Sequence, residues 1–353
     1  MISLLKNNKV VICMGTGGVG KTTISAALGV YAARSGLRTL VLTIDPAKRL
    51  AQSLGIENQP GVDVAVPGVP GLFACMIDPQ SEFDNFVRSN VENRIAEGLI
   101  KNPLYQQLVS SLSGSQEFTS LVRVINSVEQ KKYDLVILDT PPVQNSVDFL
   151  RAPERMVSLF DESVIKWFAP SNQIGFLNRL VSRGTSVVTK ALEKVTGSQF
   201  ISELRDFFAH LAFLQGKVRN TSLALNQLLH SDQTGVIIIT GFDEAKLSEA
   251  AEFKVQLKQE GLRLNAIIVN RAFPIWSDQL GQDLPVELIE LYKKMQHYYK
   301  DRIEFYNQFE KNMGDATPLL RLPDYNQAVI GIEDLETLSQ QIAERWQKKE
   351  RKE

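Results

Sequence analysis

A glycine-rich segment near the start of the chain, Gly15 to Thr22, has the residue types and spacing that bind phosphate groups. It reads GTGGVGKT and fits the pattern G-x-x-x-x-G-K-[ST], with the apolar run VVICM before it and a helical pattern after it. Glycines let backbone N–H groups converge on phosphate oxygens, the Lys21 ammonium neutralises β and γ phosphates, and the Thr22 hydroxyl binds Mg²⁺. The motif predicts a P-loop, in which Thr23 reaches the α phosphate.

The same glycines also fit a second pattern. Gly15, Gly17 and Gly20 match G-x-G-x-x-G, the fingerprint of dinucleotide-binding folds, in which Asp45 at the end of the next strand would bind the ribose. That fold requires close helix packing where this chain has Lys-Thr after the third glycine, and Pro-Ala follows the acid. Because the phosphate-loop pattern is the more specific of the two, the P-loop is the favoured interpretation.

Two apolar strands end in aspartates that suit the chemistry of a nucleoside triphosphate site. The segment YDLVILDTPP ends its strand at Asp139, which would anchor Mg²⁺ through the metal's water shell. The segment TIDPAKRL places Asp45 where it would orient the attacking water or contact Mg²⁺. The alternatives are a helix cap for Asp139 and a turn residue before Pro46 for Asp45. Beside a P-loop, the metal and catalytic roles are favoured.

The sequence favours adenine over guanine as the base. Guanine-specific P-loop proteins as a class resemble one another in an Asn-Lys-x-Asp or Thr-Lys-x-Asp segment, which this chain lacks. Asn270 ends the apolar run AIIVN, and its amide offers both a donor and an acceptor to the adenine edge. A strand-terminal turn asparagine is an equally good interpretation of Asn270 from the sequence alone.

Alternating apolar runs and helical patterns predict an α/β fold with a doubly wound, mainly parallel sheet. The predicted strands are Val10–Met14, Leu40–Ile44, Leu135–Leu138, Val236–Thr240 and Ala266–Val269. One helix is expected to begin after the N-cap Asp243 and to close at Gly261. Two stretches without convincing strands, about 80–130 and 153–230, predict a helical subdomain inserted into a single P-loop domain over 1–353.

Composition and charge narrow the partners and the compartment. The 353 residues carry 39 Lys and Arg against 40 Asp and Glu, so no overall positive field would recruit nucleic acid or an anionic membrane. The cysteines, Cys13 and Cys75, lie in apolar runs without a Cys-x-x-Cys pair, which argues against disulfides or a zinc clip. No apolar run approaches the roughly 20 residues that cross a bilayer, and no signal peptide is evident, so we expect a cytoplasmic protein without an integral membrane segment.

Five segments together resemble the ArsA/Get family of anion-pump and tail-anchored-protein-targeting ATPases, and in particular its bacterial ArsA-like branch. They are GTGGVGKTT, TIDPAKRL, YDLVILDTPP, DFLRAPER and IIVNR, and the likeness spans nearly the whole chain. The resemblance implies a Mg²⁺-dependent ATPase whose nucleotide-sandwich dimer closes on ATP and opens after hydrolysis. The partner would be a second copy or a paralogue, and the helical subdomain is a candidate surface for a protein client.

The resemblance also assigns roles to single residues. It makes Asp45 and Lys21 catalytic, and it makes Thr22, Asp45 and Asp139 the residues that hold the metal. Asn270 would contact adenine, and the loop after Leu320 would wrap the base. The residues expected to bind ATP are Gly15, Thr16, Gly17, Gly18, Val19, Gly20, Lys21, Thr22, Thr23, Asn270, Arg271, Leu322, Pro323 and Asp324.

Thr16 departs from the family pattern. The family's loop usually reads Gly-Lys-Gly-Gly-Val-Gly-Lys-Thr, and its first lysine reaches the partner's phosphates across the dimer. If that lysine works like an arginine finger, its absence would cost about 10³ to 10⁵ in rate, roughly 4 to 7 kcal/mol; the alternative is that Thr16 is neutral. We therefore expect an ATPase, and we expect its hydrolysis to be slow if Thr16 removes the contact to the partner's phosphates. The alternative is a nucleotide-binding regulatory or scaffold subunit with little hydrolysis that pairs with a catalytically complete paralogue.

Other departures concern the client. Arsenite-pump members resemble one another in a cysteine trio that this chain lacks, and many targeting members have a zinc-binding Cys-x-x-Cys and methionine-rich helices. The missing cysteines argue against arsenite binding. No methionine falls between Met156 and Met295, so the sequence does not indicate a flexible, methionine-rich groove for a client protein. The segment from Ser158 to Val181, which includes Trp167, holds more apolar residues than one helical stripe needs. Burial in the subdomain or at a dimer interface is favoured over a client surface.

Overall fold

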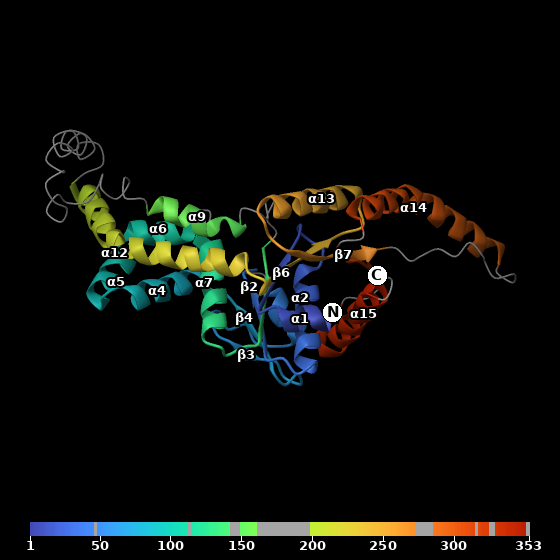
Figure 1. Cartoon of the computed structure of the whole chain (residues 1–353), viewed down its shortest axis with the longest axis horizontal. Helices are drawn as coiled ribbons and strands as arrows, with labels where there is room; N and C mark the ends of the chain where they lie inside the picture. The colour runs from blue at the N-terminus through green and yellow to red at the C-terminus, as the bar shows by residue number, and fades with distance from the viewer. Residues whose placement is uncertain are drawn as a thin grey trace. The chain divides into compact units, whose positions relative to one another are not determined.

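The computed structural model describes residues 1–45, 48–111, 115–141, 149–160, 198–272, 285–314, 317–324 and 329–350. The chain divides into two compact units. Unit 1 comprises Met1–Met76, Asn126–Val147 and Leu229–Glu353, and unit 2 comprises Ile77–Ile125 and Asp148–Leu228. Figure 1 shows the helices and strands of both units.

Unit 1 contains one sheet, to which the described residues contribute eight strands in the order β3-β4-β2-β5-β1-β6-β7-β8. Neighbouring strands are parallel except for the antiparallel pair β3 and β4. The strands are β1 (Val10–Met14), β2 (Thr39–Thr43), β3 (Val64–Ala65), β4 (Leu72–Met76), β5 (Leu135–Asp139), β6 (Thr234–Thr240), β7 (Leu264–Ala272) and β8 (Leu319–Pro323). Every residue of β1, β2, β5 and β6 is buried, as in sheets covered on both faces. The predicted α/β fold with a doubly wound, mainly parallel sheet is confirmed.

Helices of unit 1 cover the sheet. They are α1 (Ile2–Asn7), α2 (Lys21–Arg34), α3 (Arg49–Leu54), α13 (Glu244–Gln259), α14 (Val286–Met313) and α15 (Gly331–Glu350). One apolar cluster joins α1, α2, α3 and α15 to one face of the sheet, with Trp346 of α15 buried in it. Helix α13 packs on β6 and β7, and Figure 1 shows it across the sheet from α15.

Local signals set the ends of α13 as predicted. The side chain of Asp243 caps its start by accepting a hydrogen bond from the backbone N–H of Lys246 at 3.1 Å. The helix ends at Gln259, and Gly261 follows with φ +70° while the N–H of Leu262 reaches back to Leu257. Only glycine takes this left-handed turn without strain, so the position fixes where the chain leaves the helix.

The described secondary-structure elements of unit 2 are all helices. Its helices are α4 (Pro79–Asn90), α5 (Asn93–Ile100), α6 (Pro103–Ser111), α7 (Ser115–Glu129), α9 (Ala152–Leu159) and α12 (Ser198–Leu229). Its core is aromatic, because Phe83, Tyr105 and Phe118 are fully buried and contact one another or Phe86. Most of the apolar segment from Ser158 to Val181 lies outside the described residues. No described helix is long and apolar enough to span a membrane.

Candidate functional site

The candidate site lies at the carboxyl edge of the sheet in unit 1, where β1, β2 and β5 end side by side. In the parallel register, Cys13 of β1 and Thr43 of β2 both pair with Asp139, the last residue of β5. The loop that follows β1 leads directly into α2, whose first residue is Lys21. The predicted phosphate loop, strand acid and helix N-terminus therefore meet at one edge, where α/β sheets bind their ligands.

Two glycines of the loop fill positions that a side chain would obstruct. Gly15 has φ +152°, and a Cβ atom there would lie 1.9 Å from the carbonyl oxygen of Ile239 on β6. Gly20, the residue before α2, has φ +89°, and its Cβ would lie 2.6 Å from the amide nitrogen of Asn270. Glycine is needed at both positions because the loop backbone packs directly against β6 and β7.

Side chains hold three carbonyl oxygens of the loop. The oxygens of Thr16, Val19 and Gly18 accept hydrogen bonds from Lys21 Nζ at 2.9 Å, Asn270 Nδ2 at 2.8 Å and Arg271 Nη1 at 3.5 Å, respectively. A carbonyl oxygen that pointed at a phosphate would repel it. Engaging these oxygens on side chains fixes the loop in a shape that leaves its N–H groups for an anion at the start of α2.

Lys21 is a buried cation that forms no ion pair within the described residues. It is only 7% exposed, and its ammonium binds a neutral carbonyl oxygen. Burial lowers the pKa of Lys21, while the nearby carboxylates of Asp139 and Asp45 oppose that shift. Because a buried charge is costly unless it is paired, a bound phosphate would give Lys21 the anionic partner that it lacks.

Asp139 lies at the bottom of the site with one carboxylate oxygen engaged and the other free. Its Oδ2 accepts hydrogen bonds from Thr22 Oγ1 at 2.7 Å and Thr43 Oγ1 at 2.9 Å. Its Oδ1 is buried without a hydrogen-bond partner. Burial raises the pKa of Asp139 to about 6, although both hydroxyls and Lys21 act in the opposite direction. A cation or its bound water would satisfy the free oxygen and favour the ionised acid.

The donors around Asp139 fit Mg²⁺ held together with a nucleotide. The described residues contain no cluster of three or more His, Cys, Asp or Glu that could hold a metal ion by itself. Mg²⁺ commonly keeps several waters and takes only one or two protein ligands beside substrate phosphates. The Thr22 hydroxyl and the free Asp139 oxygen are a donor set of that kind.

Asp45 follows β2 at the same edge and is partly exposed. Its backbone N–H donates to Thr43 Oγ1 at 3.2 Å, and its Oδ2 lies 3.7 Å from Arg49 Nε in α3. The negative charge of Asp45 contributes to the raised pKa of Asp139, because a like charge nearby disfavours the ionised acid. Pro46 and Ala47, which follow Asp45, lie outside the described residues.

A β-bulge shapes the end of β7. Val269 pairs with Arg321 of β8, but the next pair is Ala272 with Pro323, so Asn270 and Arg271 together oppose a single residue. Arg271 has φ +54°, which is uncommon for a residue with a side chain. The extra residue turns both side chains toward the loop after β1, where they bind the carbonyl oxygens of Val19 and Gly18.

The remaining residues expected to bind the base lie beside this bulge. Leu322 is fully buried, Pro323 is half-buried and Asp324 is exposed. The backbone N–H of Asp324 donates to the carbonyl oxygen of Ala272 at 2.8 Å, which holds the end of β8 against the end of β7. The structure thus places Leu322 to Asp324 beside Asn270 and Arg271, on the same side of the loop.

Thr16 and its neighbours complete the loop. The Thr16 hydroxyl is a buried oxygen atom without a hydrogen-bond partner, while its carbonyl oxygen binds Lys21. Val19 is buried, Gly17 and Gly18 are exposed, and Thr23 is half-buried in the first turn of α2. The position that carries lysine in the resembled pattern is therefore occupied here by a short neutral side chain.

Two hydroxyls that were not among the predicted site residues belong to the site. Thr43 binds Asp139, and Thr140 Oγ1 donates to the carbonyl oxygen of Cys13 at 3.0 Å. Thr140 thereby joins the ends of β5 and β1. A polar residue at the end of an otherwise apolar strand was the available signal, because Thr43 stands two residues before Asp45 and Thr140 follows Asp139.

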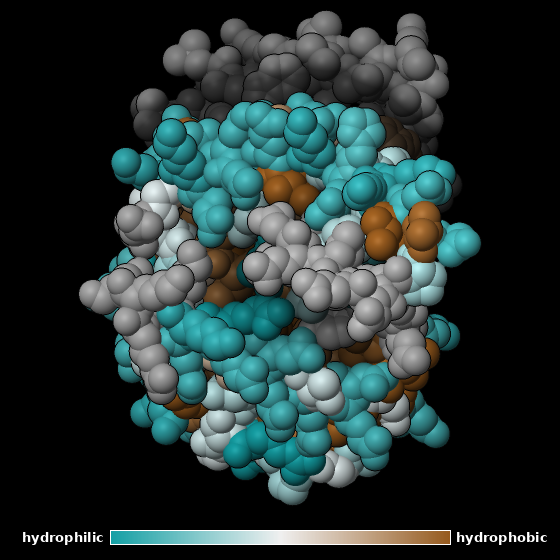
Figure 2. Space-filling view, turned by 90° about the vertical axis from the view of Figure 1, so that its right-hand side faces the viewer, coloured by the Kyte–Doolittle hydropathy of each residue, from teal (hydrophilic) through white to brown (hydrophobic). Residues whose placement is uncertain are grey.

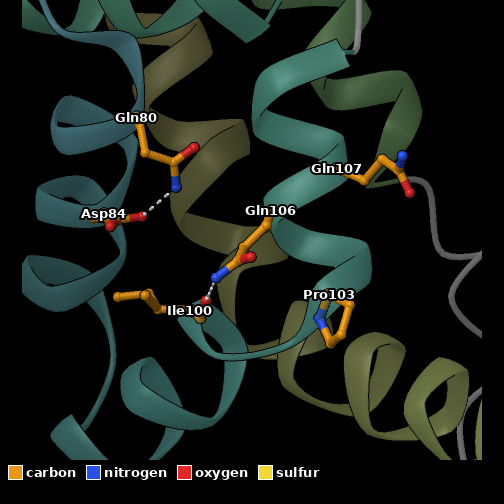
Figure 3. A pocket seen from close by; sticks show the side chains of 6 residues that line it. All are labelled: Gln80, Asp84, Ile100, Pro103, Gln106 and Gln107. Carbon is orange, nitrogen blue, oxygen red and sulfur yellow. Dashed lines mark hydrogen bonds between the residues drawn. The ribbon is translucent and has the colours of Figure 1, made fainter.

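A separate hollow of about 690 Å³ lies within unit 2. Figure 3 shows it between α4 and α6, with Gln80 and Asp84 on one side and Pro103, Gln106 and Gln107 on the other. The Asp84 carboxylate accepts hydrogen bonds from Gln80 Nε2 at 3.2 Å and Tyr105 OH at 2.6 Å. None of the residues predicted to bind a nucleotide lines this hollow.

Comparison with known proteins gives a consistent result. A family model described as anion-transporting ATPase matches residues 8–344. "Putative arsenical pump-driving ATPase 1" of Aquifex aeolicus (strain VF5) is 26% identical over 340 residues, covering 95% of this chain and 78% of that protein. "ATPase get3" of Pyrenophora tritici-repentis (strain Pt-1C-BFP) is 27% identical over 335 residues, covering 93% and 89%. "ATPase ASNA1 homolog 2" of Paramecium tetraurelia is 26% identical over 304 residues, covering 84% and 83%. The resemblance noted in the sequence is confirmed, and the chain belongs to the anion-transporting ATPase family.

Proposed function

We propose that this chain binds ATP with Mg²⁺ in the loop from Gly15 to Thr23 and hydrolyses it to ADP and phosphate. Membership of an ATPase family supports the reaction class. The observation that carries the proposal is the hydrogen bond from Thr22 Oγ1 to Asp139 Oδ2 at 2.7 Å. It joins the P-loop hydroxyl to the strand-end acid, the pair that holds Mg²⁺ beside the phosphates in P-loop enzymes.

At the phosphate end, each residue has a distinct role. Lys21 would exchange the carbonyl oxygen of Thr16 for the β and γ phosphates and neutralise their charge. Thr22 and Asp139 would hold Mg²⁺, which supplies charge neutralisation at the transferred phosphoryl group. Asp45, partly exposed at the same edge, would orient the attacking water and contact the metal's water shell.

At the base end, the bulge of β7 presents the groups that would contact adenine. One Asn270 donor is engaged by Val19, and the rest of the amide can pair with the base edge. Arg271 would cover the ribose side, and Leu322, Pro323 and Asp324 would wrap the base. The common position of these residues beside the phosphate loop supports this assignment.

The family resemblance further supports a cytoplasmic dimer, formed with a second copy or a paralogue, that closes on ATP. We infer a single P-loop domain with a helical subdomain inserted at about 80–130 and 153–230. The composition of unit 2 from Ile77–Ile125 and Asp148–Leu228 supports this organisation. A protein client on the helical subdomain is part of the same proposal.

Thr16 favours a second candidate function. A neutral side chain where the family's loop carries lysine removes a cation from the partner's phosphates. If threonine in place of this lysine abolishes hydrolysis, the chain would be a regulatory subunit. Such a subunit would bind ATP, hydrolyse little of it and pair with a paralogue that carries the lysine. The presence of Asp45 at the site favours the ATPase over this regulatory subunit.

The test combines ATP binding, steady-state hydrolysis and oligomeric state, measured on the full chain with Mg²⁺. Lys21→Ala should weaken ATP binding by about 2 to 3 kcal/mol, or about 30- to 150-fold, because a charged contact to phosphate is lost. Asp45→Asn should keep binding and lower the rate by about 100-fold or more. Lys101→Ala, which removes an exposed lysine of unit 2, is the matched control and should change neither quantity.

The outcomes separate the hypotheses. A chain that binds no adenine nucleotide would contradict both candidate functions. Binding of ATP without measurable turnover by the unchanged chain would select the regulatory subunit. Turnover that Asp45→Asn leaves unchanged would remove Asp45 from the proposed mechanism.

A further inference from the structure

Arg49 is an exposed cation at the edge of the candidate site, and the proposed function gives it no role. It is the first residue of α3, and its Nε lies 3.7 Å from Oδ2 of Asp45. The Arg49 side chain is 64% exposed, whereas the Asp45 side chain is only 18% exposed. Arg49 therefore reaches a mostly buried carboxylate of the site from the solvent side.

A chain of contacts connects Arg49 to the strand-end acid. The backbone N–H of Asp45 donates to Thr43 Oγ1 at 3.2 Å, and that hydroxyl donates to Asp139 Oδ2 at 2.9 Å. Burial is the main cause that lowers the pKa of Lys21, and the positive charge of Arg49 lowers it further. The guanidinium thus lies close enough to the phosphate-binding ammonium to act on it.

Helix α3 holds the backbone of Arg49 in place. Leu50, Ala51 and Leu54 are buried in the apolar cluster on the sheet, whereas Arg49 and Gln52 are exposed. Because the buried side chains fix the helix, Arg49 can change its contact by rotating its side chain alone. The separation of 3.7 Å from Asp45 is longer than a hydrogen bond, and exposed ion pairs contribute little, so this contact can be given up readily.

The charges at the phosphate end favour a second cation. Asp45 and Asp139 are acids, Lys21 is the cation that the loop contributes, and Thr16 adds no charge. ATP keeps a negative charge even with one Mg²⁺ bound, so a site with two acids and one cation would weaken its binding. Arg49 balances the second acid.

We propose that Arg49 senses the γ phosphate of ATP, an inference that rests on the proposed function. Without nucleotide, Arg49 pairs with Asp45. When ATP binds, the guanidinium turns to the γ phosphate and leaves the Asp45 carboxylate to orient the attacking water, whereas ADP leaves the pair intact. A guanidinium suits this exchange because its planar N–H groups match the oxygens of a carboxylate and of a phosphate. The contact is made within one chain, so it does not replace the cation that Thr16 removes across the dimer.

The test compares the affinities of ADP and of AMP-PNP, a non-hydrolysable ATP analogue, for the full chain with Mg²⁺ by isothermal titration calorimetry. Arg49→Ala should weaken AMP-PNP binding by about tenfold, because one charge-assisted contact is lost, and should change ADP binding by less than about twofold. Arg49→Lys keeps the charge but lacks the planar N–H groups, so it should weaken AMP-PNP binding by about threefold. The test measures binding without turnover and therefore applies to both candidate functions.

Two controls remove the same charge elsewhere. Lys48→Ala changes the adjacent residue, which is exposed and has no ion pair within the described residues. Alanine would meet the same backbone strain there as lysine, at φ +58°. Lys293→Ala changes an exposed residue of α14, which carries none of the predicted site residues. Figure 2 looks onto the end of the chain at which Figure 1 shows α14, and the described residues in view are mostly hydrophilic, so the loss of one lysine leaves this surface hydrophilic.

Both controls should keep the ratio of the AMP-PNP and ADP affinities, and circular dichroism should show that all variants are folded. A ratio that Arg49→Ala leaves unchanged would overturn the sensor role and leave the proposed function in place. An equal change of the ratio in Lys48→Ala would assign the effect to net charge and would also overturn it. An unchanged chain that binds neither nucleotide would contradict the proposed function and this inference together.

Discussion

The phosphate end and the base end of the candidate site hold the same loop by different means. At the phosphate end, Lys21 and Thr22 are the first residues of α2, which follows the loop directly. Asp139 is the last residue of β5, and the pairing of β5 with β1 places Asp139 beside Thr22. At the base end, Asn270 and Arg271 reach the loop from β7, and they do so through a bulge. The first end is fixed by local sequence and parallel pairing, the second by one extra residue in a strand.

This difference separates two properties of the site. Loss of a charge at the phosphate end acts where phosphoryl transfer would occur, so it should alter the rate in addition to any change in affinity or stability. Changes at the base end act on loop placement and on the groups around the base, so they should alter stability and nucleotide affinity but leave the rate at saturating ATP unchanged. A base-end variant with a lower rate at saturating ATP would contradict the comparison.

The largest effect is expected from restoring a cation at the phosphate end. Thr16→Lys should raise ATP hydrolysis by about 10³-fold if the family's lysine works like an arginine finger, because it would return a positive charge to the partner's phosphates. Steady-state phosphate release, measured over a range of protein concentrations, tests this because a contact across a dimer depends on association. Affinity for ATP should change far less than the rate.

Thr16→Gln is the control for Thr16→Lys. Its side chain is long and polar but carries no charge, so it should leave hydrolysis near that of the unchanged chain. An equal rise in both variants would assign the effect to loop shape rather than to charge. An unchanged rate in Thr16→Lys would show that Thr16 is a neutral variant of the loop.

A smaller effect, on stability, is expected at Gly15. Gly15→Ala should lower the free energy of unfolding by about 3 kcal/mol, because a Cβ atom 1.9 Å from the Ile239 carbonyl forces the loop away from β6. Urea unfolding without nucleotide measures the change. Gly18→Ala provides the comparison: its φ is also positive, at +76°, but no atom lies within 4 Å of the added Cβ, so it should cost only about 1 kcal/mol. Equal costs would mean that backbone strain, and not the close contact, requires glycine at position 15.

Much of the phosphate end could be predicted from the sequence. The apolar run Val10–Met14 followed by glycines and Lys-Thr specifies strand, loop and helix by local pattern, and the fold class followed from the alternation of such runs. Predicting that Asp139 lies close to Thr22 required one further rule, which is that the carboxyl ends of parallel strands lie at the same edge of the sheet. The roles of these residues in catalysis and metal binding stay predictions.

The base end could be predicted only in part. Asn270 was identified as the end of an apolar run, but its contact with Val19 depends on a bulge between β7 and β8. A bulge depends on how two strands pair, and no local pattern in the segment AIIVNRA predicts an extra residue in this strand. The role of Thr43 was missed for a related reason, because a threonine in a buried strand reads as ordinary β-branched core.

The free energy of unfolding should depend on pH through Asp139 at the phosphate end. The pKa of Asp139 in the folded chain, about 6, lies above its ordinary value of 3.8, so the folded state holds this proton more tightly than the unfolded state. The resulting stabilisation is present below about pH 4 and is lost as the pH rises through about 6, a loss of about 2 to 3 kcal/mol. Urea unfolding from pH 4 to 7, without Mg²⁺ or nucleotide, should show this loss relative to Asp139→Asn. Parallel stability curves for the two chains would contradict the shifted pKa.

The smallest effect is expected at the bulge, where backbone strain and side-chain contact can be separated. Arg271 has φ +54°, so Arg271→Gly should relieve strain and raise the free energy of unfolding by about 1 kcal/mol, while the loss of the contact with Gly18 should weaken ATP binding a few-fold. Arg271→Ala loses the same contact but keeps the strain, so it should weaken binding equally without the gain in stability. Thermal unfolding and ATP titration of both variants measure the two terms. Equal stability of the glycine and alanine variants would show that the bulge holds no strain, and the base end would then differ from the phosphate end only in its contacts.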